Sequence, residues 1–225
     1  SSLGVYKPPA MNDPAPCPLC SSIDTRHFHQ ETQREYLICP ICDVVFVHPK
    51  HYLRREAELK RYELHKNAID DSGYRSFLQR LCGPLQERIA PESIGLDFGC
   101  GPGPLLKIML EEQGHTISLF DTFFAPDIKV FNFAYDFITA TEVVEHLQHP
   151  LIELDRLWSR LNSGGVLGVM TSMRNPETSF PTWHYLSDPT HIVFYSTGTM
   201  AWLANRWSAT LEIISDSVVI FTKSG

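Results

Sequence analysis

The chain has 225 residues, 43% of them apolar and 20% charged, which is long enough for one α/β domain with a small accessory module. No apolar run approaches the roughly 20 residues that span a bilayer, and no N-terminal signal pattern is visible, so we expect a cytoplasmic protein without a membrane segment. The net charge of −7 is uneven: residues 1–92 carry 12 basic and 12 acidic side chains, and residues 93–225 carry 7 and 14. The second half therefore lacks the positive charge typical of a surface that binds a phosphate backbone.

Two C-x-x-C pairs, separated by 18 residues, mark the first part of the chain: Cys17 with Cys20 and Cys39 with Cys42. A hairpin that brings two such pairs together presents four thiolates in a tetrahedron, the arrangement that structural zinc prefers. Disulfides or a redox C-x-x-C are the alternatives, and both fit a cytoplasmic chain less well. We therefore expect a zinc ribbon over residues 17–50, in which the ion is structural because no coordination position is left for water. Its expected strands are residues 26–30, 36–38 and 44–47.

The segments on either side of this ribbon have simpler patterns. Residues 1–16 contain four prolines and no periodicity, which indicates a flexible leader. Residues 51–92 follow a helical pattern, with breaks expected near 70–73 and at 83–84, and are interpreted as a helical bridge. The first part of the bridge is locally basic, so contact with nucleic acid is an alternative to an ordinary solvated helix face.

A short apolar strand over residues 94–98 leads into a glycine-rich turn, and a helix follows at once. Glycines let a ligand approach the main chain closely, and the helix directs free N–H groups to the same place. The dinucleotide pattern G-x-G-x-x-G is the poorer match because the chain has Pro104 at its last position. The turn instead resembles motif I of class I S-adenosylmethionine-dependent methyltransferases, which implies that it holds the amino-acid and ribose parts of that cofactor. The cofactor residues expected here are Asp97, Gly99, Cys100, Gly101 and Gly103.

From residue 93 onward strand and helix patterns alternate, which predicts a Rossmann-like, doubly wound parallel sheet over residues 93–225. Ligands of such sheets bind beyond the carboxyl ends of the strands. Asp121 follows the second strand, where methyltransferases and dehydrogenases both use an acid for the ribose hydroxyls; a helix N-cap is the structural alternative. The expected strands are residues 94–98, 116–120, 137–141, 166–171, 211–214 and 218–222, and the expected helices are 104–113, 150–161 and 197–206.

The segment after Asp121 departs from the resemblance. Only fourteen residues separate Asp121 from Asp136, too few for the family's usual helix and third strand. The adenine contacts of the family therefore cannot be transferred, and Phe123 is a candidate to stack on the base or, alternatively, a core residue.

The strand expected over residues 137–141 lies within the stretch Asp-Phe-Ile-Thr-Ala-Thr-Glu-Val-Val-Glu-His-Leu, residues 136–147. This stretch resembles the D-x-I-x-x-x-x-V-x-E-H-L motif of the methyltransferase group that includes quinone-ring and sugar enzymes. The resemblance implies that Thr141 and Glu142 lie beside the cofactor's sulfonium and that Glu145 and His146 open toward the substrate. Methyl transfer requires an aligned nucleophile and removal of its proton. His146 is the best candidate base, and a structural histidine is the alternative.

Two further segments have candidate functional residues. The long aromatic loop over residues 173–196 contains His184, Tyr185 and His191, which could share the acid–base role, line a wall for a ring substrate, or simply plug the top of the sheet. Many class I methyltransferases close an N-terminal helical segment over the cofactor. That resemblance makes Tyr62, His65 and Asn67 lid candidates, with a plain connecting helix as the alternative.

These patterns together predict an S-adenosylmethionine-dependent methyltransferase that acts on a small-molecule acceptor and holds a structural zinc ion. A zinc module in front of such a domain also resembles bacterial ribosomal RNA guanine methyltransferases, so an RNA base is the second candidate acceptor. A zinc-dependent interaction protein with a vestigial cofactor fold is the third hypothesis, and it predicts no cofactor binding. The sequence gives no indication of the oligomeric state.

Overall fold

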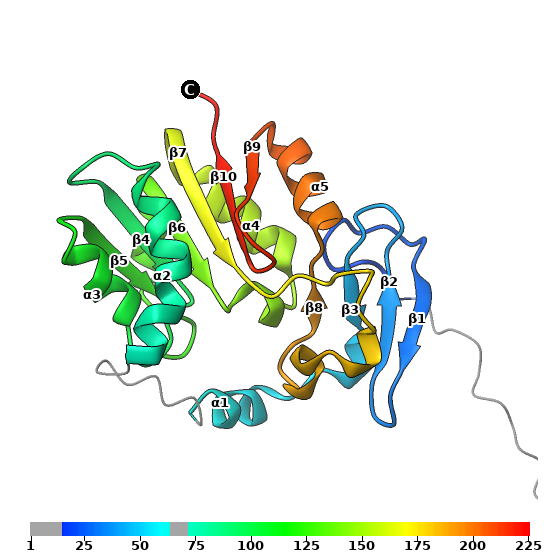
Figure 1. Ribbon diagram of the computed structural model, residues 1–225. Helices are drawn as coiled ribbons and strands as arrows, with labels where there is room; N and C mark the ends of the chain where they lie inside the picture. The colour runs from blue at the N-terminus through cyan, green and yellow to red at the C-terminus, as the bar shows by residue number, and fades with distance from the viewer. Residues whose placement is uncertain (1–14, 64–71) are drawn as a thin grey trace, which may run out of the picture.

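The computed structural model describes residues 15–63 and 72–225 of the chain. A six-stranded sheet with the order β5-β4-β6-β7-β10-β9 forms its centre (Figure 1). Strands β5, β4, β6 and β7 are parallel, whereas β10 runs antiparallel to both of its neighbours. The expectation of a parallel sheet is therefore confirmed for its first four strands and corrected at β10. The strands are β4 (Ile94–Phe98), β5 (Thr116–Phe120), β6 (Tyr135–Thr141), β7 (Leu161–Met170), β9 (Thr210–Ile213) and β10 (Val218–Thr222).

Helices cover both faces of this sheet, because its central strands are apolar on both sides. In β10, Ile220 packs in the cluster that contains residues of α2 and α3, while Val219 and Phe221 pack with residues of α4 and α5. This alternation is the period of two expected of a strand. The helices are α2 (Ser72–Gln86), α3 (Leu105–Glu111), α4 (Pro150–Ser159) and α5 (Thr197–Trp207).

Helix α2 does not break at residues 83–84, contrary to the sequence expectation. Pro84 lies inside the helix, in its last turn, where a missing N–H costs only one intrahelical bond near the end. Leu81 and Leu85 on either side of it are fully buried against the core, so packing holds the helical conformation through the proline.

The cysteine-containing segment forms a second sheet of order β1-β2-β3-β8, all antiparallel. Its fourth strand comes from the far end of the chain: Val45 pairs with Phe194 and Phe46 with Val193. Buried residues of this sheet and of the large sheet also belong to one continuous apolar cluster. The ribbon is thus joined to the sheet domain by both backbone pairing and packing. Its strands are β1 (Arg26–Gln30), β2 (Glu35–Ile38), β3 (Val45–Val47) and β8 (Val193–Phe194).

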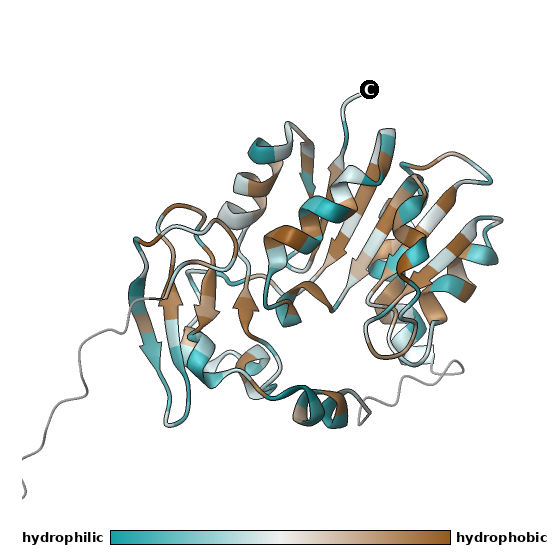
Figure 2. Cartoon of the chain, turned by 180° about the vertical axis from the view of Figure 1, so that it is seen from behind, coloured by the Kyte–Doolittle hydropathy of each residue, from teal (hydrophilic) through white to brown (hydrophobic). Residues whose placement is uncertain are grey.

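Helix α1 (Arg55–Glu63) lies between the two sheets and is largely hydrophilic, as Figure 2 shows. Five short 3-10 helices occupy the connections, and among the described residues no helix is long and apolar enough to cross a membrane. No strand forms between β5 and β6, as the short spacing predicted; a 3-10 helix, η2 (Ile128–Asn132), replaces it. The other 3-10 helices are η1 (Pro49–His51), η3 (Val144–His146), η4 (Phe180–Thr182) and η5 (His184–Ser187).

Candidate functional site

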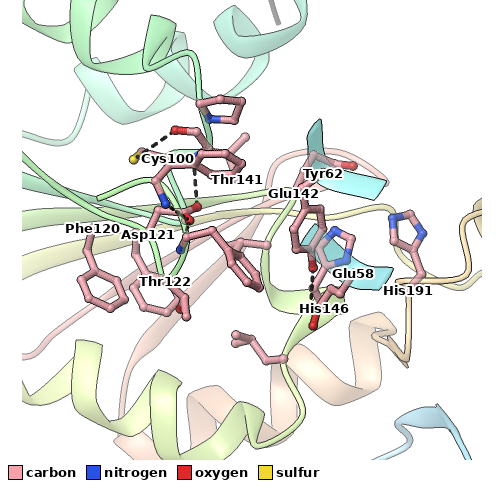
Figure 3. Close-up of a pocket in the computed structure, with 18 of the residues that line it drawn as sticks. Glu58, Tyr62, Cys100, Phe120, Asp121, Thr122, Thr141, Glu142, His146 and His191 are labelled. Carbon is pink, nitrogen blue, oxygen red and sulfur yellow. Dashed lines mark hydrogen bonds between the residues drawn. The ribbon is translucent and has the colours of Figure 1, made fainter. Parts of the chain in front are cut away.

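A cavity of about 840 Å³ opens at the carboxyl ends of β4, β5 and β6 (Figure 3). The glycine-rich turn, the turn after β5 and the segment after β6 form its walls, α1 and α2 add side chains from the other side, and the 188–191 segment closes one end. This is the edge of the sheet where parallel strands place their ligands. The predicted residues that line it are Tyr62, Gly99, Cys100, Gly101, Asp121, Phe123, Thr141, Glu142, His146 and His191.

The glycine-rich turn uses two left-handed residues, Gly99 at φ +77° and Gly101 at φ +64°. A Cβ on Gly99 would lie 2.3 Å from Cγ2 of Val143, whereas a Cβ on Gly101 would meet open space. Gly99 is therefore required for packing, and Gly101 leaves its backbone accessible to a ligand in the cavity. Gly103 is not among the residues that line the cavity, so the structure does not place it against a ligand.

Asp121 joins the first two turns through its carboxylate. Oδ2 accepts the N–H of Gly101 at 3.0 Å, and Oδ1 accepts those of Phe123 at 2.8 Å and Phe124 at 3.1 Å. Asp121 is not a helix N-cap, because the next helical turn, η2, begins only at Ile128. The carboxylate instead organises the cavity wall where the sequence predicted a ribose contact.

Asp97 is buried behind the glycine-rich turn and does not line the cavity. The hydroxyl of Thr139 lies 3.0 Å from its Oδ1. Burial raises the pKa of Asp97 to about 7, and the nearby Asp121 charge adds to the shift. Asp97 therefore supports the glycine-rich turn from the protein interior.

Two glutamates follow β6 and face different directions. Glu142 lines the cavity with a left-handed backbone (φ +49°), which is unusual for a residue with a Cβ. Glu145 is fully buried, so the expectation that it opens toward the substrate is wrong. Its carboxylate accepts the hydroxyls of Tyr185 and Thr171, and the Tyr185 hydroxyl also lies 3.3 Å from Glu142 Oε2.

The pKa values of both carboxyl groups are raised. Burial, followed by the charge of Glu145, raises the pKa of Glu142 to about 9. Burial also raises the pKa of Glu145. No Lys or Arg among the residues that the structure describes forms an ion pair with either glutamate.

His146 and His191 lie side by side at the same end of the cavity, with ring centroids 4.8 Å apart. Nδ1 of His146 is 3.0 Å from the carbonyl oxygen of Thr190, and Nδ1 of His191 is 2.7 Å from that of Tyr185. A carbonyl only accepts, so each Nδ1 carries the proton and each Nε2 holds a lone pair in the neutral ring. Burial lowers the pKa of His191, which favours this neutral form.

The aromatic loop contributes less to the cavity than predicted. His184 is exposed and is not among the residues that line the cavity. Tyr185 is buried and stacks on Trp183 at 5.1 Å, and only its hydroxyl reaches the glutamates. The ring of Tyr185 thus packs in the core between the two sheets, and the cavity receives His191 from this loop.

Helix α1 contributes three side chains to the cavity, those of Arg55, Glu58 and Tyr62. The ring of Tyr62 lies 5.6 Å from Phe123 and 5.3 Å from His146, and its hydroxyl donates to Glu58 at 2.7 Å. The Arg55 guanidinium sits 4.9 Å above the Phe123 ring. Burial raises the pKa of Tyr62, so the phenol stays protonated. The other lid candidates, His65 and Asn67, lie outside the described residues.

The thiols of four cysteines lie close together in the ribbon. Cys17 Sγ lies 3.5 Å from Cys42 Sγ, and Cys20 Sγ lies 3.4 Å from Cys39 Sγ. These separations exclude disulfides, and all six cysteines of the chain are free. Sulfurs bound tetrahedrally to one zinc at about 2.3 Å stand roughly 3.8 Å apart, close to the observed spacing. The donor set therefore fits zinc, with Cys17, Cys20, Cys39 and Cys42 as its ligands.

The sequence did not reveal Arg55, Glu58 and Asp188 as cavity residues. Arg55 and Glu58 lie on α1, where a charged residue has no signal that separates a cavity wall from a solvated face, and Asp188 lies in the loop after η5. A further unexpected contact comes from Arg34, at the tip of the β1–β2 hairpin. Its guanidinium donates to carbonyl oxygens of the segment that contains His191, those of Leu186, Asp188 and His191.

The sheet order, the turn after β4 and the acid after β5 define a Rossmann-like methyltransferase fold. Residues 71–212 match the model of a family described as a methyltransferase domain, and the chain belongs to that family. No curated protein matches the sequence.

Solved structures share the fold at low sequence identity. An O-methyltransferase family protein of Burkholderia thailandensis is 13% identical (TM-score 0.50); the match covers 75% of this chain and 63% of that one, so this chain spans less than two thirds of that protein. The 1,6-didemethyltoxoflavin N1-methyltransferase of the same organism, solved with 1,6-didemethyltoxoflavin and S-adenosylhomocysteine, is 14% identical (TM-score 0.50; 88% and 99% covered). A putative methyltransferase in complex with the Trm112 activator of Haloferax volcanii is 10% identical (TM-score 0.52; 77% and 100% covered).

Proposed function

We propose that this protein transfers a methyl group from S-adenosylmethionine to a small-molecule acceptor. The observation that supports the proposal best is the composition of one cavity, in which the backbone of Gly101, the carboxylate of Asp121 and the segment from Thr141 to His146 meet. In this proposal Gly101 and Asp121 would hold the amino-acid and ribose parts of the cofactor, and Phe123 would stack on its base. Thr141 and Glu142 would lie beside its sulfonium, and His146 would face the substrate. The motif after β6 further favours the group of quinone-ring and sugar enzymes.

S-Adenosylmethionine would supply its methyl group from a sulfonium. Transfer would form a bond from the acceptor atom to the methyl carbon while the carbon–sulfur bond breaks, and the electron pair of that bond would stay on sulfur as a neutral thioether. The acceptor's proton must also leave. When no metal ion is bound to His146, its Nε2 holds a lone pair that can accept this proton. The Nδ1–H bond to the carbonyl oxygen of Thr190 fixes the ring in the required tautomer.

The contacts made by basic residues at positions 50–61 favour a small acceptor over RNA. Lys50 pairs with Glu35 at 2.7 Å, Arg61 lies 3.6 Å from Asp188, and Arg55 stacks on Phe123. These three of the five cations at positions 50–61 serve internal contacts, whereas Arg54 and Lys60 are exposed. The second half of the chain is acidic. A bound phosphate backbone would need free positive charge.

The four cysteines are proposed to hold a structural zinc ion that braces the cavity. The ribbon pairs with β8 and, through Arg34, holds the segment that ends at His191. With four thiolate ligands the ion has no open position for chemistry. Free thiolates of this kind suit a reducing compartment such as the cytoplasm. The proposed division is a ribbon over 17–50, a bridge over 51–92 and a catalytic domain over 93–225.

Isothermal titration of the zinc-loaded protein with S-adenosylhomocysteine, NAD and a short structured RNA tests the proposal. We expect micromolar binding of S-adenosylhomocysteine alone. Additional RNA binding that weakens steeply with salt would favour a ribosomal RNA acceptor. If none of the three binds, the vestigial fold of an interaction protein becomes the better account.

A further inference from the structure

Three side chains that could share an ion converge at the inner end of the cavity. One ligand atom each from Glu145, His146 and His191 lies within 4.8 Å of the other two. His146 Nε2 is 3.9 Å from Glu145 Oε1. Donors bound to one divalent cation at about 2.1 Å stand roughly 3 to 4 Å apart, and the observed limit of 4.8 Å exceeds this range by less than about 1 Å.

The hydrogen bonds around these side chains match those of metal ligands. Each histidine gives its Nδ1–H to a backbone carbonyl, which orients the ring and leaves Nε2 as the donor atom. Metal-bound histidines almost always have such a second contact. Glu145 is likewise held by the hydroxyls of Tyr185 and Thr171. All three ligand atoms are therefore preoriented by their neighbours.

The two carboxyl groups near the site also favour a bound cation. Glu145 is fully buried and Glu142 lies close by, joined to it through the Tyr185 hydroxyl. Among described residues neither carboxylate has a Lys or Arg ion-pair partner. A buried carboxylate is normally paired or bound to a metal. Two imidazoles with one carboxylate are a ligand set that suits first-row divalent ions.

We propose that Glu145, His146 and His191 bind a divalent cation at the inner wall of the cavity, and that the ion takes an oxygen atom of the methyl acceptor. Three protein ligands leave open coordination positions, and His146 and His191 both line the cavity, so these positions face the space beside Glu142. The first half of the proposal stands on the geometry alone. The second half rests on the proposed function.

A cation at this place changes the role of the histidines from bases to ligands. Binding to a divalent ion lowers the pKa of a hydroxyl group and so favours loss of its proton. The proton then passes to water, the oxygen forms the bond to the methyl carbon, and the carbon–sulfur electron pair stays on sulfur. The acceptor class is therefore a compound with a hydroxyl group that can bind a metal, and the transfer is to oxygen.

Titration of the zinc-loaded protein with Mn²⁺, followed by the electron paramagnetic resonance signal of free Mn²⁺, tests the cation site. Mn²⁺ is a suitable probe because thiolates bind it poorly, so the cysteine site keeps its zinc. In Glu145→Gln the side chain keeps its shape and loses its charge. In His191→Asn the amide can still donate to Tyr185 O, but no atom replaces Nε2. The matched control is His149→Asn, an exposed histidine at the start of α4 whose side chain makes no cap hydrogen bond.

We expect one Mn²⁺ per chain in the parent and the control, and at least tenfold weaker binding in both site variants. Binding of S-adenosylhomocysteine and the melting temperature, measured on every variant, report whether the fold is intact. Absence of Mn²⁺ binding in the parent, or equal binding in all four proteins, overturns the cation site. If S-adenosylhomocysteine binds while Mn²⁺ does not, this inference alone fails; the converse result refutes the cofactor proposal and leaves the cation site standing.

The acceptor half has its own probe, acetohydroxamate, which chelates metals through two oxygens. We expect it to bind the Mn²⁺-loaded parent and not the Mn²⁺-free parent or Glu145→Gln. Binding that does not depend on Mn²⁺, or no binding to the loaded protein, overturns the assignment of an oxygen acceptor to the ion.

Discussion

Gly101 combines a left-handed backbone with an open space above its Cα, so a side chain there would occupy the cavity itself. We expect Gly101→Arg to remove detectable S-adenosylhomocysteine binding in calorimetry. Gly114→Arg is the matched control: Gly114 is also left-handed with open space around it, but it lies outside the cavity. Both variants should lose a similar 1 to 2 kcal/mol of stability from backbone strain. Normal binding by Gly101→Arg would show that the cofactor site is misplaced.

Asp97 makes stability depend on pH. Its pKa in the folded chain is about 7, against a usual 3.8, so between these values the native state holds a proton that the unfolded state has lost. Stability therefore falls as pH rises through this range, by about 1.4 kcal/mol per unit and about 4 kcal/mol in total. We expect Asp97→Asn to gain this amount relative to the parent between pH 4 and 7, with no further change above pH 7.

Urea unfolding at several pH values measures that difference. Asp127→Asn, at an exposed turn, controls for the loss of one negative charge. Parallel stability curves for Asp97→Asn and the parent would contradict the prediction.

The sequence identified those cavity residues whose position follows from local spacing along the chain. Gly99, Gly101, Asp121 and Thr141 line the cavity because each follows a strand at the carboxyl edge of one sheet. The direction of Glu145 could not be read in the same way. It depends on Tyr185, forty residues later in the chain, whose position is set by tertiary packing.

Among the elements, β8 shows why the ribbon and the catalytic domain are not independent. This strand pairs with β3 and follows directly on the segment held by Arg34, which includes His191. Loss of the proposed zinc ion should therefore loosen the cavity wall as well as the ribbon.

Replacement of one zinc ligand tests this coupling. We expect Cys39→Ser to lose zinc and to lower the melting temperature together, and to increase amide hydrogen exchange over residues 185–194. Cys82→Ser, a buried cysteine of α2 outside the cluster, is the control and should keep its zinc. Metal analysis that finds full zinc content in Cys39→Ser would count against the four-cysteine site.

Most element boundaries were predictable because alternating and helical periods are local. The first two strands of the large sheet agree residue for residue, and so does its last, β10. The direction of β10 and the recruitment of β8 were not predictable, because strand pairing depends on residues far apart in the sequence. The helix through Pro84 escaped prediction for a related reason: burial of its neighbours outweighs a local helix breaker.

For the whole molecule, α1 lies between the two sheets beside the cavity, and none of its described side chains is fully buried. It contacts the cavity wall through the Tyr62 ring against Phe123 and His146 and the Arg55 stack on Phe123. A helix held by so few buried contacts opens at low free-energy cost. This is the property expected of a lid that admits and releases a cofactor.

Two substitutions at Tyr62 separate the lid from a passive connection. Tyr62→Ala removes the ring contacts with Phe123 and His146, so we expect S-adenosylhomocysteine to dissociate roughly tenfold faster in stopped-flow measurements, since about 1.4 kcal/mol of contact energy corresponds to that factor. Tyr62→Phe keeps the ring and loses only the hydrogen bond to Glu58, so its dissociation rate should stay within about twofold of the parent. If Tyr62→Ala releases the ligand at the parental rate, α1 does not close over the bound cofactor, and its role is limited to joining the ribbon to the sheet.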